Sequence, residues 1–276
     1  MPAKVPNGAS RGYIIPIGGA EDRVDNTEIL KRFINICGDE PTVAVIPTAS
    51  ALPETGPEYM DIFQSLGARR AIVMNLRTRA DCDSEETRKI LDSVDGVFIT
   101  GGNQLRLSTT LGGTHAARML RSRNAAGMPI AGTSAGAAIM PEHMIAGGET
   151  GATPEAEMTT LVPGLGLSNK ILVDQHFRQR DRIGRLLAAI SYNPFPLGLG
   201  IDEDTAAFID GEDHVEVVGT GAVTVLDPSH LKFSSAAETA EGRAVCMIDL
   251  RLHILTPGSR YDINSRLATP PDNQMN

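Results

Sequence analysis

The sequence predicts an α/β fold, a three-layer sandwich in which helices cover both faces of a parallel sheet. Short apolar runs alternate with helix-period segments over the first two thirds of the 276 residues, which is typical of parallel strands joined by crossover helices. The runs are almost continuously apolar, as expected for strands buried on both faces. Ligands of such folds bind at the carboxyl ends of the strands.

The predicted strands are short, aliphatic or β-branched, and bounded by Gly, Pro, Asn or Asp. They lie at Tyr13–Ile17, Thr42–Pro47, Ala71–Asn75, Gly96–Thr100, Pro129–Gly132 and Lys170–Val173. The segments between them repeat apolar residues at helical spacing. These predicted helices lie at Asn26–Cys37, Pro57–Leu66, Ser84–Leu91, Thr114–Asn124 and Arg180–Ser191.

The last third of the chain changes character, because strand-like runs there are joined by short turns. They lie at Thr205–Asp210, His214–Val218, Ala222–Leu226 and Ala244–Leu250, and predict antiparallel strands added to the sheet. We expect a single α/β domain over residues 13–268, preceded by a flexible segment 1–12. The polar residues 269–276 are expected to be a disordered tail.

The composition of the chain disfavours several classes of function and location. A formal net charge of −9 disfavours nonspecific nucleic-acid binding, which depends on basic surface. No apolar run approaches the roughly 18 residues of a membrane span, and the N-terminal residues do not resemble a signal peptide. The three cysteines, Cys37, Cys82 and Cys246, are widely spaced and odd in number, which argues against a disulfide framework or a zinc site. We therefore expect a cytoplasmic protein.

The strongest local motif is Gly132-Thr133-Ser134-Ala135-Gly136, which lies between a predicted strand and a helix-compatible segment. This G-x-S-x-G pattern is typical of a nucleophile elbow, although a turn rich in Gly and Ser is often only a turn. A second glycine pair, Gly101-Gly102, ends another predicted strand. The backbone N–H groups of Gly102 and Ala135 are therefore candidates for an oxyanion hole around Ser134.

A serine nucleophile needs a general base and an acid that orients it. His176 directly follows an apolar run and is the best candidate for the base, with His143 as the main competitor. Asp202, Glu203 and Asp204 end another apolar stretch, and the residues alone do not select among them or exclude a solvated turn. The order serine, histidine, acid differs from that of α/β-hydrolases.

An arginine run follows His176. At helical spacing Arg178, Arg182 and Arg185 fall on one stripe, separate from the apolar face. Such stripes are usually solvated, but guanidinium groups beside the base suit a substrate that carries carboxylates.

Three long motifs resemble the cyanophycinase family, a branch of serine peptidases related to aspartyl dipeptidases. They are GTSAGAAIM at 132–140, DQHFRQRDRIGRLLAA at 174–189 and GLGIDEDTA at 198–206. The likeness extends from about residue 13 to about residue 266. It implies a fold akin to class I glutamine amidotransferases, a homodimer, and no metal or cofactor.

The resemblance also implies exo-cleavage of cyanophycin, a polyaspartate with arginine linked to each β-carboxyl, to β-aspartyl-arginine. Ser134 corresponds to the nucleophile, His176 to the base and Glu203 to the acid. The positions that match the family's substrate-holding residues are Gln104, Asp174, Gln175, Arg180, Arg182 and Arg185. The alternatives are a dipeptidase for short aspartyl peptides and a noncatalytic binding protein on the same scaffold.

Overall fold

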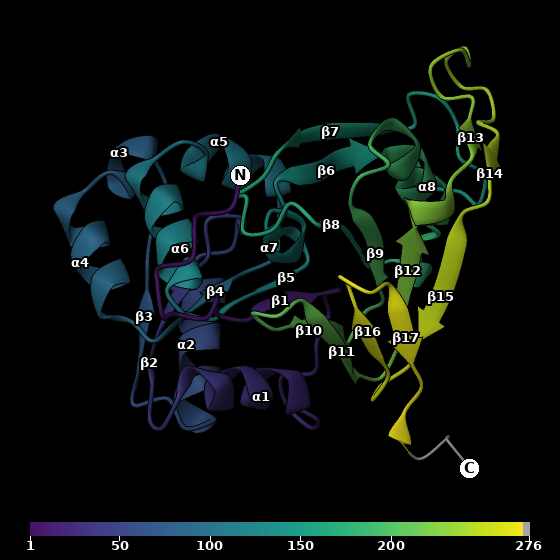
Figure 1. Cartoon of the computed structure of the whole chain (residues 1–276). Coiled ribbons are helices and arrows are strands. Elements are labelled where there is room, and N and C mark those ends of the chain that lie inside the picture. Colours follow the sequence, from purple (N-terminus) through teal and green to yellow (C-terminus); the bar gives the residue numbers. More distant parts are fainter. Residues whose placement is uncertain (273–276) are drawn as a thin grey trace.

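The computed structural model describes residues 1–272, and within them nine strands form the main sheet (Figure 1). Its parallel half consists of β1 (Ile14–Ile17), β5 (Ile130–Thr133), β4 (Gly96–Ile99), β2 (Thr42–Ile46) and β3 (Arg70–Val73), adjacent in that order. Its antiparallel half continues from β1 through β10 (Thr205–Ile209), β11 (His214–Gly219), β16 (Arg260–Asp262) and β17 (Leu267–Thr269). The predicted fold class is confirmed, and the strands predicted at Thr205–Asp210 and His214–Val218 join this sheet in antiparallel fashion. The strand predicted at Ala222–Leu226 was expected in the same sheet but pairs in a second one.

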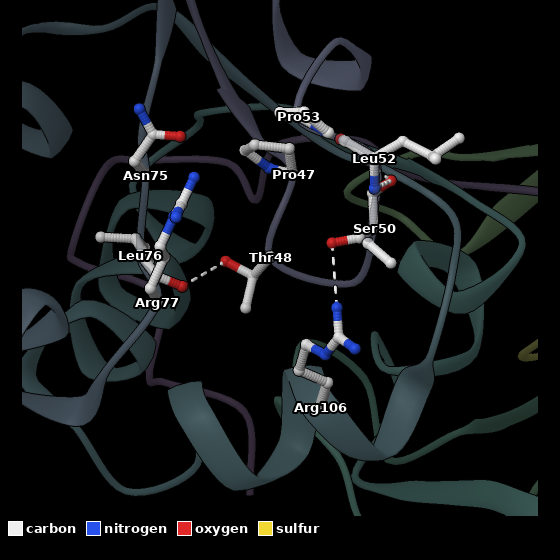
Figure 2. A pocket seen from close by; sticks show the side chains of 10 residues that line it. Pro47, Thr48, Ser50, Leu52, Pro53, Asn75, Leu76, Arg77 and Arg106 are labelled. Carbon is white, nitrogen blue, oxygen red and sulfur yellow. Dashed lines mark hydrogen bonds between the residues drawn. The ribbon is translucent and has the colours of Figure 1, made fainter.

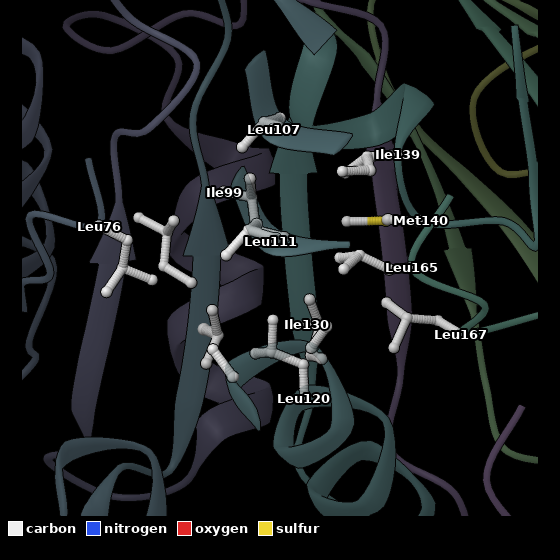
Figure 3. Packing of buried hydrophobic residues seen from close by; sticks show 14 of the residues in the cluster. Leu76, Ile99, Leu107, Leu111, Leu120, Ile130, Ile139, Met140, Leu165 and Leu167 are labelled. Atoms are coloured by element: carbon white, nitrogen blue, oxygen red, sulfur yellow. The ribbon is translucent and has the colours of Figure 1, made fainter. Parts of the chain in front are cut away.

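Helices cover both faces of the parallel half because its strands carry apolar side chains on both faces. Val43 and Val45 of β2 point into a core shared with α1 (Glu28–Cys37) and α2 (Thr55–Ser65). Ala44 and Ile46 point into the opposite core, in which Ile99, Ile130 and Ile139 also pack (Figure 3). The helices of that second side are α3 (Arg79–Cys82), α4 (Glu85–Ser93), α5 (Gln104–Leu111), α6 (His115–Ala125) and α7 (Ala135–Ala138).

A second sheet packs against the antiparallel half of the first. It consists of β8 (Ile171–Gln175), β9 (Leu197–Ile201), β12 (Val223–Asp227) and β15 (Arg251–Leu255). Val173 and Leu199 of this sheet share a core with Ala207 and Val217 of the main sheet. The sequence patterns had assigned the strand at Lys170–Val173 to the main sheet. It pairs instead with β9 in parallel, and local periodicity carries no information about which sheet a strand joins.

Other elements differ from the predictions in their bounds. The predicted helix at Arg180–Ser191 is a 3-10 turn, η1 (Arg178–Arg180), followed by α8 (Ile183–Tyr192). Asp181 between them has a φ of 47°, which an α-helix cannot continue through. Of the predicted strand at Ala244–Leu250, only Met247–Ile248 is a strand. The elements not yet placed are the hairpin β6 (His143–Gly148) and β7 (Thr159–Pro163), the pair β13 (Phe233–Ser234) and β14 (Met247–Ile248), and η2 (Pro228–His230).

The two ends of the chain differ from its middle. Residues 1–12 contain no helix or strand. Thr269, the first residue of the predicted tail, is the last residue of β17, and residues 273–276 lie outside the described part of the chain. None of the helices in residues 1–272 is both long and apolar enough to cross a bilayer.

Candidate active site

Ser134 occupies the turn between β5 and α7, where the sequence predicts a nucleophile elbow. Its backbone has φ 52° and ψ −110°, a strained conformation for a residue with a side chain. Its N–H donates to the carbonyl of Ile17 at 3.0 Å. A Cβ on Gly132 would lie 2.6 Å from the Gly136 carbonyl oxygen, and one on Gly136 would overlap the backbone of Ile99. Both glycines are therefore required for the turn to fit.

His176 follows β8 directly and reaches the serine from the second sheet. Its Nε2 lies 2.9 Å from the Ser134 Oγ. Its φ is also positive, at 47°, and its N–H donates to the Gly18 carbonyl at 2.7 Å. The imidazole packs directly on Gly19, where any Cβ would overlap the ring. The competing base candidate, His143, is an exposed residue at the start of β6.

The three consecutive acids after β9 have separate partners. The Oε1 of Glu203 lies 2.6 Å from the Nδ1 of His176. Asp202 is buried and accepts from the N–H groups of Arg178 and Ala222. Asp204 accepts from the N–H of Asp22 at 2.9 Å and from the Thr220 hydroxyl at 2.8 Å. Of the three acids, only Glu203 therefore contacts the imidazole. The two aspartates hydrogen-bond to neighbouring loop segments.

The environment favours a neutral His176. Burial lowers the pKa of the imidazole, and the hydrogen bond with Glu203 opposes this shift. The positive charges of Arg180 and Arg182 lower the pKa further. A neutral imidazole whose Nδ1–H donates to Glu203 presents the Nε2 lone pair to the serine hydroxyl.

The predicted oxyanion donors lie around the same serine. A Cβ on Gly101 would be 3.3 Å from the Ser134 Cβ, so the chain after β4 passes directly over the nucleophile. Gly102 has a φ of 135°, and a Cβ there would overlap the Ala49 backbone. Within residues 1–272, neither the Gly102 N–H nor the Ala135 N–H donates to another protein group. Both amides are therefore available to a developing negative charge.

Asp174, Arg182 and Arg185 form a buried ionic cluster behind the site. The Asp174 carboxylate accepts two hydrogen bonds from Arg185, from Nε at 2.6 Å and from Nη2. Arg182 Nη1 donates to the backbone and side-chain oxygens of Gln175, and the Oε1 of Gln175 lies 3.4 Å from the Ser134 Oγ.

This cluster differs from the predicted stripe of arginines facing a substrate, because two of the three are buried. The exposed fractions of Arg182, Arg185 and Asp174 are 8%, 4% and 1%. The helical wheel misplaced the arginines because Arg182 precedes α8 and Arg185 turns toward the buried end of β8. Direct substrate contact by Asp174 or Arg185 requires their ion pair to open.

The two remaining predicted substrate residues lie on different sides of the site. Arg180 is exposed at the end of η1, near enough to His176 to lower its pKa. Gln104 begins α5 and donates to the carbonyls of Ile145 and Ala146. Gln104 therefore ties α5 to the β6–β7 hairpin in this structure.

A cavity of about 340 Å³ opens beside Ser134 and contains an acid that the sequence analysis did not single out. Glu21 is buried there and accepts hydrogen bonds from the hydroxyls of Tyr59 and Thr133. Burial raises the pKa of its carboxyl group. An acid two residues after the Gly18-Gly19 pair, at a strand end, was the available signal. Arg23 and Glu58 line the same cavity, so it carries charges of both signs.

Residues 1–272 contain no group of three His, Cys, Asp or Glu side chains placed to hold a metal ion. The thiols of Cys37, Cys82 and Cys246 are all free.

A serine, a histidine and a carboxylate connected in series at the strand ends of an α/β sandwich are the arrangement of a serine hydrolase. The profile of Peptidase family S51 matches residues 14–217. The chain belongs to this family, which confirms the resemblance found in its motifs.

The curated relatives are similar over most of their length. The chain is 40% identical over 265 residues to a cyanophycinase of Trichormus variabilis, covering 95% of this chain and 89% of the relative. It is 39% identical over 255 residues to a cyanophycinase of Geminocystis herdmanii, covering 91% and 94%. A solved peptidase from an acI-B1 actinobacterium shares the fold with a TM-score of 0.68 at 22% identity, over 92% of this chain and 98% of that one.

Proposed function

We propose that this protein hydrolyses cyanophycin, a polyaspartate with arginine linked to each β-carboxyl, to β-aspartyl-arginine. The observation that carries the chemistry is the contact of 2.9 Å between the Ser134 hydroxyl and the His176 imidazole, backed by Glu203. The similarity to cyanophycinases over more than nine tenths of the chain supports the substrate.

In the proposed reaction, His176 Nε2 accepts the hydroxyl proton as the Ser134 Oγ attacks the scissile carbonyl. Glu203 stabilises the imidazolium that forms. The N–H groups of Gly102 and Ala135 bind the oxyanion of the tetrahedral intermediate. The imidazolium then protonates the leaving amine, and the acyl group remains on Ser134 until a water, deprotonated by His176, releases it.

Substrate positioning in this proposal involves two kinds of residue. Arg180 is the exposed guanidinium beside the base and holds a substrate carboxylate. Gln175 lies next to the nucleophile, and its orientation depends on Arg182. Asp174 and Arg185 support that arrangement from behind through their buried ion pair. The charges of both signs in the cavity beside Ser134 suit a repeating unit that has both a carboxylate and a guanidinium.

The decisive test is mass spectrometry of the products released from purified cyanophycin. Wild-type protein should release β-aspartyl-arginine, and Ser134→Ala at the same concentration should release none above background. Cleavage of short aspartyl peptides without digestion of insoluble cyanophycin would select the dipeptidase alternative. An equal product yield from the Ser134→Ala protein would contradict the proposed chemistry.

We further propose that the protein is a cytoplasmic homodimer. The resemblance to cyanophycinases supports the dimer, and the free thiols suit a reducing compartment. Light scattering should give twice the chain mass of 29.3 kDa, and cell fractionation should recover the protein with cytoplasmic markers. A measured mass of one chain would contradict the dimer. Recovery of the protein with the cell envelope would contradict the cytoplasmic location.

A further inference from the structure

A second cavity, of about 510 Å³, lies over the carboxyl ends of β2 and β3 (Figure 2). Its walls come from the segment after β2, which includes Thr48 and Ser50, and from the segment after β3, which includes Asn75 and Arg77. Arg106, in the first turn of α5, closes a third side. The proposed reaction uses none of these residues.

This cavity adjoins the one beside Ser134, because Ser50 and Leu52 line both. The order β5-β4-β2-β3 places the nucleophile, the Gly101-Gly102 turn and the second cavity successively along one edge of the sheet. Three strand spacings of about 4.8 Å span about 14 Å. An extended backbone advances about 3.5 Å per residue, so this distance corresponds to about four residues of a polymer chain.

The charge of the second cavity is unusual for a protein with a net charge of −9. Arg77 and Arg106 both line it, and no carboxylate does. Within residues 1–272 neither arginine forms an ion pair, and the Arg77 guanidinium has no hydrogen-bond partner. Arg106 uses Nη1 to donate to the Ser50 carbonyl at 3.0 Å and holds the cavity wall in place (Figure 2).

An acid close to Arg77, Asp81, is already engaged by backbone groups. The Asp81 carboxylate accepts from the backbone N–H groups of Arg77 and Thr78, where it takes part in the cap of α3. The two guanidinium groups thus remain available to a carboxylate brought by a ligand, flanked by the hydroxyl and amide groups of Thr48, Ser50 and Asn75.

We propose that the second cavity binds a substrate unit distant from the scissile bond, with Arg77 and Arg106 holding the free carboxylate of that unit. This inference rests on the proposed function. It gives the enzyme a preference for longer chains, because a substrate of two units ends before it reaches the second cavity.

The test compares two substrates, oligomers of two and of four β-aspartyl-arginine units, in the wild type and in three variants. These are Arg77→Glu, the double variant Arg77→Ala/Arg106→Ala, and the control Arg70→Ala. Arg70 is an exposed arginine at the opposite end of the same strand, β3, so it reports on the loss of surface charge alone. Because the Arg77 guanidinium has no hydrogen-bond partner among residues 1–272, Arg77→Glu should fold normally even if loss of Arg106 disturbs the loop.

On the four-unit substrate, kcat/KM should fall about tenfold or more in Arg77→Glu and in the double variant, as expected for loss of charge-assisted hydrogen bonds. On the two-unit substrate, both variants should remain close to wild type, and Arg70→Ala should be unchanged on both. Equal losses on the two lengths, or none on either, would overturn the second site. If wild type digested cyanophycin but cleaved neither oligomer, the second site would be wrong as placed, about four residues from the nucleophile. If it cleaved neither the oligomers nor cyanophycin, the proposed function itself would be wrong.

Discussion

The two halves of the active site are built on different sheets and are held in place by different kinds of interaction. Ser134 belongs to the main sheet, and its conformation is imposed by close backbone contacts around Gly132 and Gly136. His176 follows β8 of the second sheet, and Glu203 follows β9. Their position depends on a buried ion cluster and on contacts between the sheets. The nucleophile is therefore fixed by steric constraints within a few residues, and the base by interactions between segments far apart in the sequence.

The junction between the two halves consists of the residues that follow β1. The Gly18 carbonyl accepts the His176 N–H, and Gly19 lies against the imidazole ring. Glu21 contacts Thr133, the residue before the nucleophile. One short segment thus touches both halves, and small changes there should disturb the distance between serine and histidine.

The largest expected effect is on the nucleophile side. Ser134→Ala removes one half-buried hydroxyl and should lower kcat/KM on cyanophycin by about four orders of magnitude or more, as in other serine–histidine–acid sites. Its thermal unfolding should match wild type. His176→Ala should lose activity comparably, whereas His143→Ala, at an exposed strand end, should stay within a fewfold of wild type. If His143→Ala lost activity and His176→Ala kept it, His143 rather than His176 would be the general base.

On the base side the expected effect is a loss of stability. Asp174→Ala leaves Arg182 and Arg185 buried without a counter-charge, so the free energy of unfolding should fall by about 3–5 kcal/mol. Glu85→Ala breaks an exposed pair with Arg88 and should cost less than about 1 kcal/mol. Urea denaturation measures both. A loss for Asp174→Ala no larger than that for Glu85→Ala would mean that the cluster does not hold the second sheet in place.

The junction is tested by Gly19→Ala. The new Cβ would overlap the His176 ring at a residue with a φ of 100°, so the imidazole must move away from Ser134. A displacement of about 1 Å at a catalytic group is expected to lower kcat about a hundredfold. The matched control is Gly147→Ala, where a Cβ meets no atom within 4 Å. Steady-state kinetics of both variants decide the point, and unchanged kcat in Gly19→Ala would show that the contact is irrelevant.

The pH dependence of kcat/KM should show a smaller effect that comes from the same base, His176. Because burial lowers the pKa of His176 from its ordinary value of 6.5, kcat/KM should fall only as the pH drops through a value below 6.5, where imidazolium forms and cannot accept the serine proton. Glu203→Gln removes a contact that raises this pKa, so the acid limb should move lower still, together with a large loss of rate. If kcat/KM of the wild type fell already as the pH dropped through a value above 6.5, a group other than His176 would be responsible for the titration.

The comparison also explains what the sequence alone can predict. The elbow at Ser134 and the strand-end position of His176 depend on local patterns, and both residues meet in the structure. The choice among Asp202, Glu203 and Asp204 is not local, because their partners lie in segments that are distant in the sequence. The arginine stripe was predicted from helical periodicity, which cannot anticipate a partner such as Asp174 on the preceding strand.

The central claim is that Ser134 forms an acyl-enzyme with the substrate. The most direct measurement is acid quenching of the enzyme during turnover of the two-unit oligomer, followed by peptide mapping by mass spectrometry. The account predicts an added acyl group on the peptide that contains Ser134, and its absence in the Ser134→Ala protein. A catalytically active enzyme that accumulates its acyl group on another residue would contradict it.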